Sequence, residues 1–130
     1  MSSRSTTNGI AIAMGTFITA AGVMHFVKPE FFDDIVPPGL PPSRRFWTSA
    51  SGVAELIVGP MLLVPRWRRW GARAAIVLFL AVYPANLYMA WDWRDRPAGE
   101  QAVAYGRLPF QFLFIWLAWR VMRAEQRPER

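Results

Sequence analysis

The sequence GIAIAMGTFITAAGVMHFV at residues 9–27 is an apolar run without an acidic residue, lysine or arginine, and Lys28 and Pro29 follow it directly. A helix of about 19 residues is about 28 Å long, which is enough to cross the hydrocarbon core of a bilayer. Pro29 should end this helix, because the residue before a proline avoids the helical conformation. A cleaved signal peptide is the alternative, but the run is longer than the apolar part of such a peptide and only Arg4 supplies a preceding charge. We therefore expect a retained membrane-spanning helix.

Similar apolar blocks recur along the rest of the chain. Hydrophobic residues make up 53% of the 130 residues, and seven residues are tryptophan. A soluble domain of this size would leave too much apolar surface in contact with water. The sequence predicts an all-α fold, an integral membrane bundle of four transmembrane helices that forms a single domain over residues 1–130. The predicted spans are about residues 9–27, 44–64, 70–91 and 107–122.

The segments between the spans are polar or rich in proline. We expect residues 1–8 to be disordered and residues 29–36 to form a short interfacial helix with a proline in its first turn. Residues 37–42, PPGLPP, cannot continue a helix and should form a stiff strap. Ser43 is a suitable N-cap for the second span. Residues 92–106 are predicted to be a loop with at most a helical turn.

The basic residues predict the orientation of the helices. The formal net charge is +6. The side of the termini and the second loop carries Arg4, Arg66, Arg68, Arg69, Arg73, Arg120, Arg123, Arg127 and Arg130, and the other side carries Lys28, Arg44, Arg45, Arg94, Arg96 and Arg107. The excess on the first side predicts that both termini are cytoplasmic. No basic face alternates with exposed aromatic residues, which argues against nucleic acid as a partner.

The chain has no cysteine and only one histidine. These absences exclude disulfides, thiolate metal sites, cysteine nucleophiles and a haem held by two histidines. No Ser/His/Asp arrangement can be identified by spacing. We predict no catalytic residue and no metal site, and we do not expect this chain to be an enzyme by itself.

Four strongly polar side chains lie inside the predicted spans: His25, Glu55, Asn86 and Gln111. At about 1.5 Å per residue, His25, Asn86 and Gln111 should share a layer below the outer interface, while Glu55 lies about 16 Å into its span. Glu55 follows Gly52 at helical spacing, and such stripes of small residues mark close contacts between membrane helices. The four side chains should therefore face the interior of the bundle and line a small polar pocket.

Two interpretations of these residues remain open. They can hold helices together through hydrogen bonds, each contributing about 0.6 kcal/mol or somewhat more. They can instead bind a small ligand or carry a proton, because ionisable groups inside a membrane usually serve a function. A buried Glu55 must then be either protonated or paired.

Several ordered blocks of the sequence resemble the DoxX family of membrane proteins. They are Gly22-Val23-Met24-His25-Phe26 with Pro29, Pro37-Pro38 with Leu40-Pro41, Ser51-Gly52-Val53 with Glu55-Leu56 and Gly59, Pro84-Ala85-Asn86 with Tyr88-Met89-Ala90, and Arg107-Leu108-Pro109-Phe110-Gln111. The resemblance implies a four-helix, multi-pass protein of the bacterial inner membrane. It also implies an association with membrane redox systems, including quinone-linked oxidoreductases, or with oxidative-stress enzymes.

The leading hypothesis is a non-catalytic accessory subunit of a membrane redox or stress system. Its pocket of His25, Glu55, Asn86 and Gln111 would bind a quinone-like or other small amphipathic ligand. Besides the lipid bilayer, the expected partner is a membrane oxidoreductase or another membrane protein. One alternative is an assembly partner without a ligand of its own. Another is a small transporter, which would need a homo-oligomer to enclose a pathway.

Overall fold

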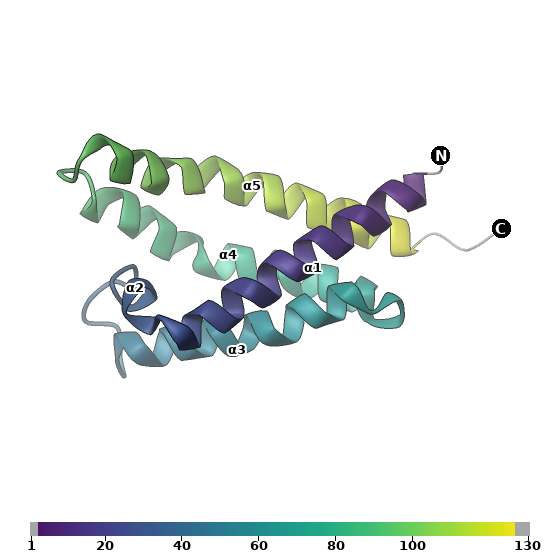
Figure 1. Ribbon diagram of the computed structural model, residues 1–130, viewed down its shortest axis with the longest axis horizontal. Helices are drawn as coiled ribbons and strands as arrows, with labels where there is room; N and C mark the ends of the chain where they lie inside the picture. Colours follow the sequence, from purple (N-terminus) through teal and green to yellow (C-terminus); the bar gives the residue numbers. More distant parts are fainter. Residues whose placement is uncertain (1–2, 127–130) are drawn as a thin grey trace.

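The computed structural model describes residues 3–126, and this part of the chain is entirely helical apart from its connections. Its elements in order are α1 (Ser3–Val27), α2 (Pro29–Asp33), α3 (Arg44–Leu63), the 3-10 helix η1 (Pro65–Trp67), α4 (Arg68–Asp92) and α5 (Ala98–Gln126). The four long helices, α1, α3, α4 and α5, alternate in direction, and α1 runs diagonally across the bundle (Figure 1). The start of α1 and the end of α5 therefore lie at the same end of the bundle as η1. We call this the η1 end and the opposite end the α2 end.

Within residues 3–126, three helical segments are long and apolar enough to cross a membrane, namely Ser5–Val27, Arg44–Leu63 and Pro65–Asp92. The protein is therefore an all-α protein with at least these three candidate membrane spans. The fourth long helix, α5, is less apolar because Arg107, Gln111 and Arg120 interrupt its hydrophobic sequence.

The surface of the bundle carries many large apolar side chains. Val77 is 66% exposed, and Phe17 and Phe112 are more than half exposed. Such a surface suits the hydrocarbon core of a bilayer and would be unfavourable in water. Arginine side chains lie over tryptophan rings at both ends of the bundle, for example Arg73 over Trp70 at 5.0 Å and Arg94 over Trp91 at 4.0 Å. Such amphipathic pairs are typical of the two membrane–water interfaces.

The helices associate mainly as two pairs, α1 with α3 and α4 with α5. At the η1 end both pairs share one apolar core, whose buried residues are Ala11, Met14, Ile18, Val58, Leu62, Ala72, Ala75, Ala118 and Val121. At the α2 end a second, smaller cluster packs Ile35 against Met89, Ala90, Trp93 and Ala104. The two pairs are thus joined by packed side chains at both ends.

The close contact between α1 and α3 depends on glycine. A methyl group on Gly15 would lie 2.8 Å from the carbonyl oxygen of Gly59, and one on Gly22 would lie 3.1 Å from the carbonyl oxygen of Gly52. Gly15 and Gly22 of α1 therefore face Gly59 and Gly52 of α3, so the stripe that the sequence indicated at Gly52 does lie at a close helix contact. This contact lets the backbones approach more closely than larger residues would allow.

Arg68 is buried and holds the η1 end together. It is only 4% exposed, and its Nε donates a hydrogen bond to the carbonyl oxygen of Leu62 at 2.7 Å. Its other nitrogens donate to the carbonyl of Leu63 at 3.2 Å and to Oδ1 of Asn8 at 3.1 Å. Arg68 thus satisfies carbonyl groups left without partners at the end of α3 and links them to α1.

Two local expectations from the sequence are wrong. Residues 3–8 are helical rather than disordered, while residues 1–2 lie outside the described part. The loop expected over residues 92–106 shortens to a turn, because α5 already begins at Ala98. The Gln101 side chain donates hydrogen bonds to the carbonyl oxygens of Arg94 and Arg96, at 2.5 and 2.8 Å, and so stabilises the turn against the first turn of α5.

Replacing Gly59 with alanine should destabilise the protein by about 1 kcal/mol or more, because over-packing forces helices apart. The added methyl group would lie 2.7 Å from the backbone nitrogen of Thr19 and 2.9 Å from the carbonyl oxygen of Gly15. Gly9→Ala is the matched control, since nothing lies within 4 Å of its new methyl group. That variant should gain roughly 0.5 kcal/mol from helix propensity. Unfolding in detergent measures both, and equal effects of the two variants would contradict the proposed contact.

Candidate functional site

A cavity of about 830 Å³ lies between the two helix pairs, toward the α2 end. All four polar residues singled out in the sequence line it: His25, Glu55, Asn86 and Gln111. They come from four different helices, so the bundle brings together side chains that are far apart in the chain. Most of the remaining wall is apolar. Its volume is in the range of pockets that hold small organic ligands.

His25 and Glu55 form the polar part of the wall that belongs to α1 and α3. Nδ1 of His25 lies 2.7 Å from the carbonyl oxygen of Ala21 and 3.2 Å from Oε2 of Glu55. A carbonyl oxygen can only accept, so we assign the Nδ1 proton to the shorter bond with Ala21. Oε2 of Glu55 is then close to His25 but has no hydrogen bond, although it is buried. A buried oxygen without a partner is costly and is therefore a candidate contact for a ligand.

His25 lies deeper in the bundle than the sequence suggested. Its position two residues before the end of α1 placed it near the outer rim, whereas Glu55 is eleven residues into α3. Gly22, five residues before the end of α1, lies against Gly52, eight residues after the start of α3. The end of α1 is therefore about one helical turn below the level at which α3 begins. The space above the end of α1 is filled by α2, where the Phe32 ring stacks on the His25 ring with centroids 3.7 Å apart. His25 is therefore covered rather than exposed at a rim.

Asn86 and Gln111 form the polar part of the wall that belongs to α4 and α5. Nδ2 of Asn86 donates a hydrogen bond to Oε1 of Gln111, and Nε2 of Gln111 donates one to the carbonyl oxygen of Phe79. Both residues are buried, with 6% and 4% of their surface exposed. These bonds connect side chains and backbone across α4 and α5, which agrees with the interpretation that the amides hold helices together.

Arg107 is a cavity residue that the sequence analysis assigned only to the basic residues of the outer side. Its side chain lines the cavity from α5, and its positive charge interacts with the charge of Glu55 on the other helix pair. Arg107 precedes Gln111 by four residues, so both lie on one face of the helix. This spacing was the signal in the sequence that could have identified it.

The floor of the cavity is aromatic. The Phe114 ring packs against Phe17, Phe79 and Phe110 with centroid distances of 5.3, 5.5 and 5.9 Å. All four rings line the cavity. The cavity thus combines ionisable groups with an apolar region large enough for a chain or ring. This combination suits an amphipathic molecule.

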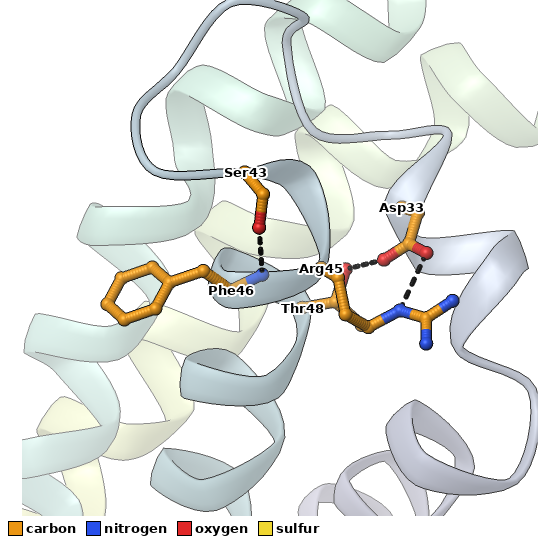
Figure 2. Close-up of polar contacts among 5 residues, drawn as sticks. All are labelled: Asp33, Ser43, Arg45, Phe46 and Thr48. Carbon is orange, nitrogen blue, oxygen red and sulfur yellow. Dashed lines mark hydrogen bonds and ion pairs between the residues drawn. The ribbon is translucent and has the colours of Figure 1, made fainter.

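The short helix α2 is fixed over the cavity by hydrogen bonds to the first turns of α3 (Figure 2). Oδ1 of Asp33 accepts a hydrogen bond from Oγ1 of Thr48 at 2.6 Å, and Oδ2 accepts one from Nε of Arg45 at 2.9 Å. Ser43 caps α3 as the sequence predicted, accepting a hydrogen bond from the Phe46 nitrogen at 3.1 Å. These contacts fix the position at which α2 covers His25.

The strap after α2 is held by the same part of α3. Nε of Arg44 donates to the carbonyl oxygen of Val36 at 2.8 Å, and Nε1 of Trp47 donates to that of Pro41 at 3.1 Å. Val36 and Trp47 also line the cavity. We call α2 and the strap together the cover. The cover is an ordered part of the cavity wall.

No metal centre is indicated within the described residues, where no three His, Cys, Asp or Glu side chains come together in a way that could hold an ion. The cavity offers instead one acid, one imidazole, one guanidinium and the ammonium group of Lys28. These groups can bind a polar head group and exchange a proton with it.

Removing the Asp33 carboxylate should loosen α2. In Asp33→Ala, Thr48 and Arg45 lose their shared acceptor, and we expect hydrogen exchange of the backbone amides of residues 30–36 to rise about fivefold to tenfold. The matched control is Asp34→Ala, because Asp34 is exposed and adjacent. Mass spectrometry of exchange in lipid nanodiscs measures both variants. Unchanged protection of α2 in Asp33→Ala would mean that packing alone holds it.

A comparison with protein-family models gives one match. The model described as "Domain of unknown function (DUF8561)" matches residues 14–122, which include every cavity residue discussed above. No curated protein and no solved structure matches the chain.

Proposed function

The chain belongs to the DUF8561 family, and on this premise we propose that it is a four-span membrane protein that binds a small amphipathic molecule in the cavity between its helix pairs. The observation that carries the proposal is the buried Oε2 of Glu55, which has no hydrogen bond and lies beside His25 in a largely apolar cavity. Buried polar atoms without a partner are rare in native proteins, and ionisable groups inside a membrane usually serve a function.

The fourth span in this proposal is α5. It packs along α4 over the length of the bundle (Figure 1). Near its end, Arg120 lies over Trp116 and Arg123 over Trp119, as expected of a helix that reaches an interface. Four spans place both termini on one side, and the larger number of basic residues at the η1 end favours the cytoplasm.

The resemblance to DoxX-like proteins extends the proposal to the cellular setting. It favours the bacterial inner membrane and a role as a non-catalytic accessory subunit beside a membrane redox or stress system. A quinone-like molecule is one class of ligand that would suit this setting. Its carbonyl oxygens could accept hydrogen bonds at the polar wall while its tail lies on the phenylalanine floor.

The membrane topology can be tested directly because the chain has no cysteine of its own. We expect Asp95→Cys, in the turn before α5, to react with a membrane-impermeant maleimide in intact spheroplasts. Glu125→Cys, near the end of α5, should react only after the membrane is permeabilised. Reaction of both on the same side would contradict the fourth span, whereas the opposite pattern would contradict only the orientation.

Glu55→Leu separates a ligand site from a purely structural role. If Glu55 serves a ligand, removing a costly buried acid should leave the unfolding stability unchanged or raised while the occupancy of a co-purified amphiphile falls about tenfold. Native mass spectrometry from mild detergent measures occupancy, and thermal unfolding measures stability. If Glu55→Leu lowers the stability and the unsubstituted protein carries no bound molecule, the result would favour the function as an assembly partner instead.

Gln111→Leu is the matched comparison. This variant removes the hydrogen bonds that join α5 to Asn86 and to the Phe79 carbonyl oxygen. It should therefore lower stability by about 1 kcal/mol. If Glu55→Leu keeps or raises the stability while Gln111→Leu lowers it, Glu55 serves a ligand and Gln111 holds α5 to α4.

A further inference from the structure

The side chain of Arg107 differs in its hydrogen bonding from those of three other arginines of the bundle. Arg44, Arg45 and Arg68 each donate hydrogen bonds to a carbonyl or carboxylate oxygen. Arg107 lines the cavity, yet over residues 3–126 its guanidinium has no hydrogen bond and no ion pair within contact distance. A guanidinium has five N–H donors, so leaving all of them without an acceptor beside an apolar cavity is unfavourable.

Glu55 does not supply the hydrogen-bond acceptor that the Arg107 guanidinium lacks. The charges of Glu55 and Arg107 interact across the cavity, but the two side chains form no direct salt bridge. They belong to different helix pairs, α3 and α5, so a molecule between the pairs can contact both. An oxygen placed there would accept from Arg107, and a Glu55 carboxyl that carries its proton would donate to the same head group.

The charges that line the cavity favour an anion. Lys28 and Arg107 are basic and Glu55 is acidic, while Nδ1–H of His25 donates to the carbonyl of Ala21. With a neutral imidazole, the lining carries a net positive charge whether Glu55 is ionised or carries its proton. Asp33, the closest acid of α2, is bound to Thr48 and Arg45 and does not line the cavity.

We propose that the cavity selects a single-chain amphiphile with an anionic carboxylate or phosphate head group, and that Arg107 is the residue that binds the anionic oxygens. The proposal rests on the proposed function, because it names the ligand class of the same cavity. Guanidinium groups bind carboxylate and phosphate through two parallel hydrogen bonds. The head group would lie between Glu55 and Arg107, with Lys28 nearby and the chain over Phe114 and the three phenylalanines around it. An uncharged head group would leave the guanidinium without charge compensation.

The test uses three photoactivatable probes with the same alkyl chain: palmitate, hexadecyl phosphate and hexadecanol. Each is added to the full chain in phosphatidylcholine nanodiscs, and labelled peptides are mapped by mass spectrometry. Labelling of the cavity residues Phe79 and Phe114 reports binding, whereas labelling of the exposed Val77 and Phe112 reports dissolved probe in the bilayer. The first two probes distinguish a carboxylate from a phosphate source.

We expect the anionic probes to label the cavity at concentrations roughly tenfold lower than hexadecanol, and Arg107→Gln to abolish that difference. Arg94→Gln is the matched control, since Arg94 is exposed at the same end of the bundle and does not line the cavity. Arg107→Lys keeps the charge and should retain preference for an anion even if Arg107→Gln proves too unstable to purify. Unchanged labelling by hexadecanol in Arg107→Gln would show that the cavity itself is intact.

The outcomes separate the two proposals. If hexadecanol labels the cavity as well as palmitate does, independently of Arg107, the anionic class is wrong and the proposed function stands. If the Arg94 and Arg107 variants lose anion labelling equally, Arg107 is not the binding residue. If no probe labels the cavity above the level of the bilayer-facing residues, both proposals fall.

Discussion

The backbone contact between α1 and α3 determines the position of most other features of the protein. Because Gly15 faces Gly59 and Gly22 faces Gly52, the two helices cannot slide along each other without a clash. This fixed register places His25 beside Glu55 even though the residues lie at different distances from their helix ends. It also leaves the end of α1 below the start of α3, and that step is the space in which α2 lies.

Hydrogen bonding divides the polar residues of the cavity into two kinds. The amides of Asn86 and Gln111 bond to each other and to the α4 backbone, so they complete the α4–α5 pair without any ligand. Glu55 and Arg107 lie on different helix pairs and do not complete each other in this way. Stability alone would favour removing such groups or joining them. Their separation across a cavity is better explained by a ligand that contacts both.

The sequence predicted much of the architecture because its signals are local. Apolar length identified the first three candidate spans. The spacing of Gly52 and Glu55 identified a helix-contact face on α3, although not that α1 is the helix packed against it. The DoxX resemblance and the full span count remain predictions, since the chain matches a family without an assigned function. The four polar residues expected to face the bundle interior, His25, Glu55, Asn86 and Gln111, do line one cavity. A polar side chain in an apolar membrane helix faces the interior of the bundle, because contact with lipid is costly.

What the sequence did not predict depends on tertiary geometry. Arg66, Arg68 and Arg69 look alike in the sequence, and only the path of η1 turns Arg68 inward onto the last carbonyl groups of α3. The bond between Asp33 and Thr48 joins residues on either side of a proline-rich strap, and no periodic pattern relates them. Arg107 is the exception, because its spacing from Gln111 was visible in the sequence.

The cover formed by α2 explains how a polar group can function inside this small bundle. Phe32 of α2 stacks on His25, and Ile35, two residues after α2, packs against Met89 of α4 and against Trp93, which directly follows α4. The segment formed by α2 and Ile35 therefore touches both helix pairs. A bundle packed along its whole length would need no such cover and would have no cavity. Here the apolar core at the η1 end supplies the packing that holds the pairs together. The α2 end can therefore keep an internal space, since interactions elsewhere compensate for the packing that the cavity lacks.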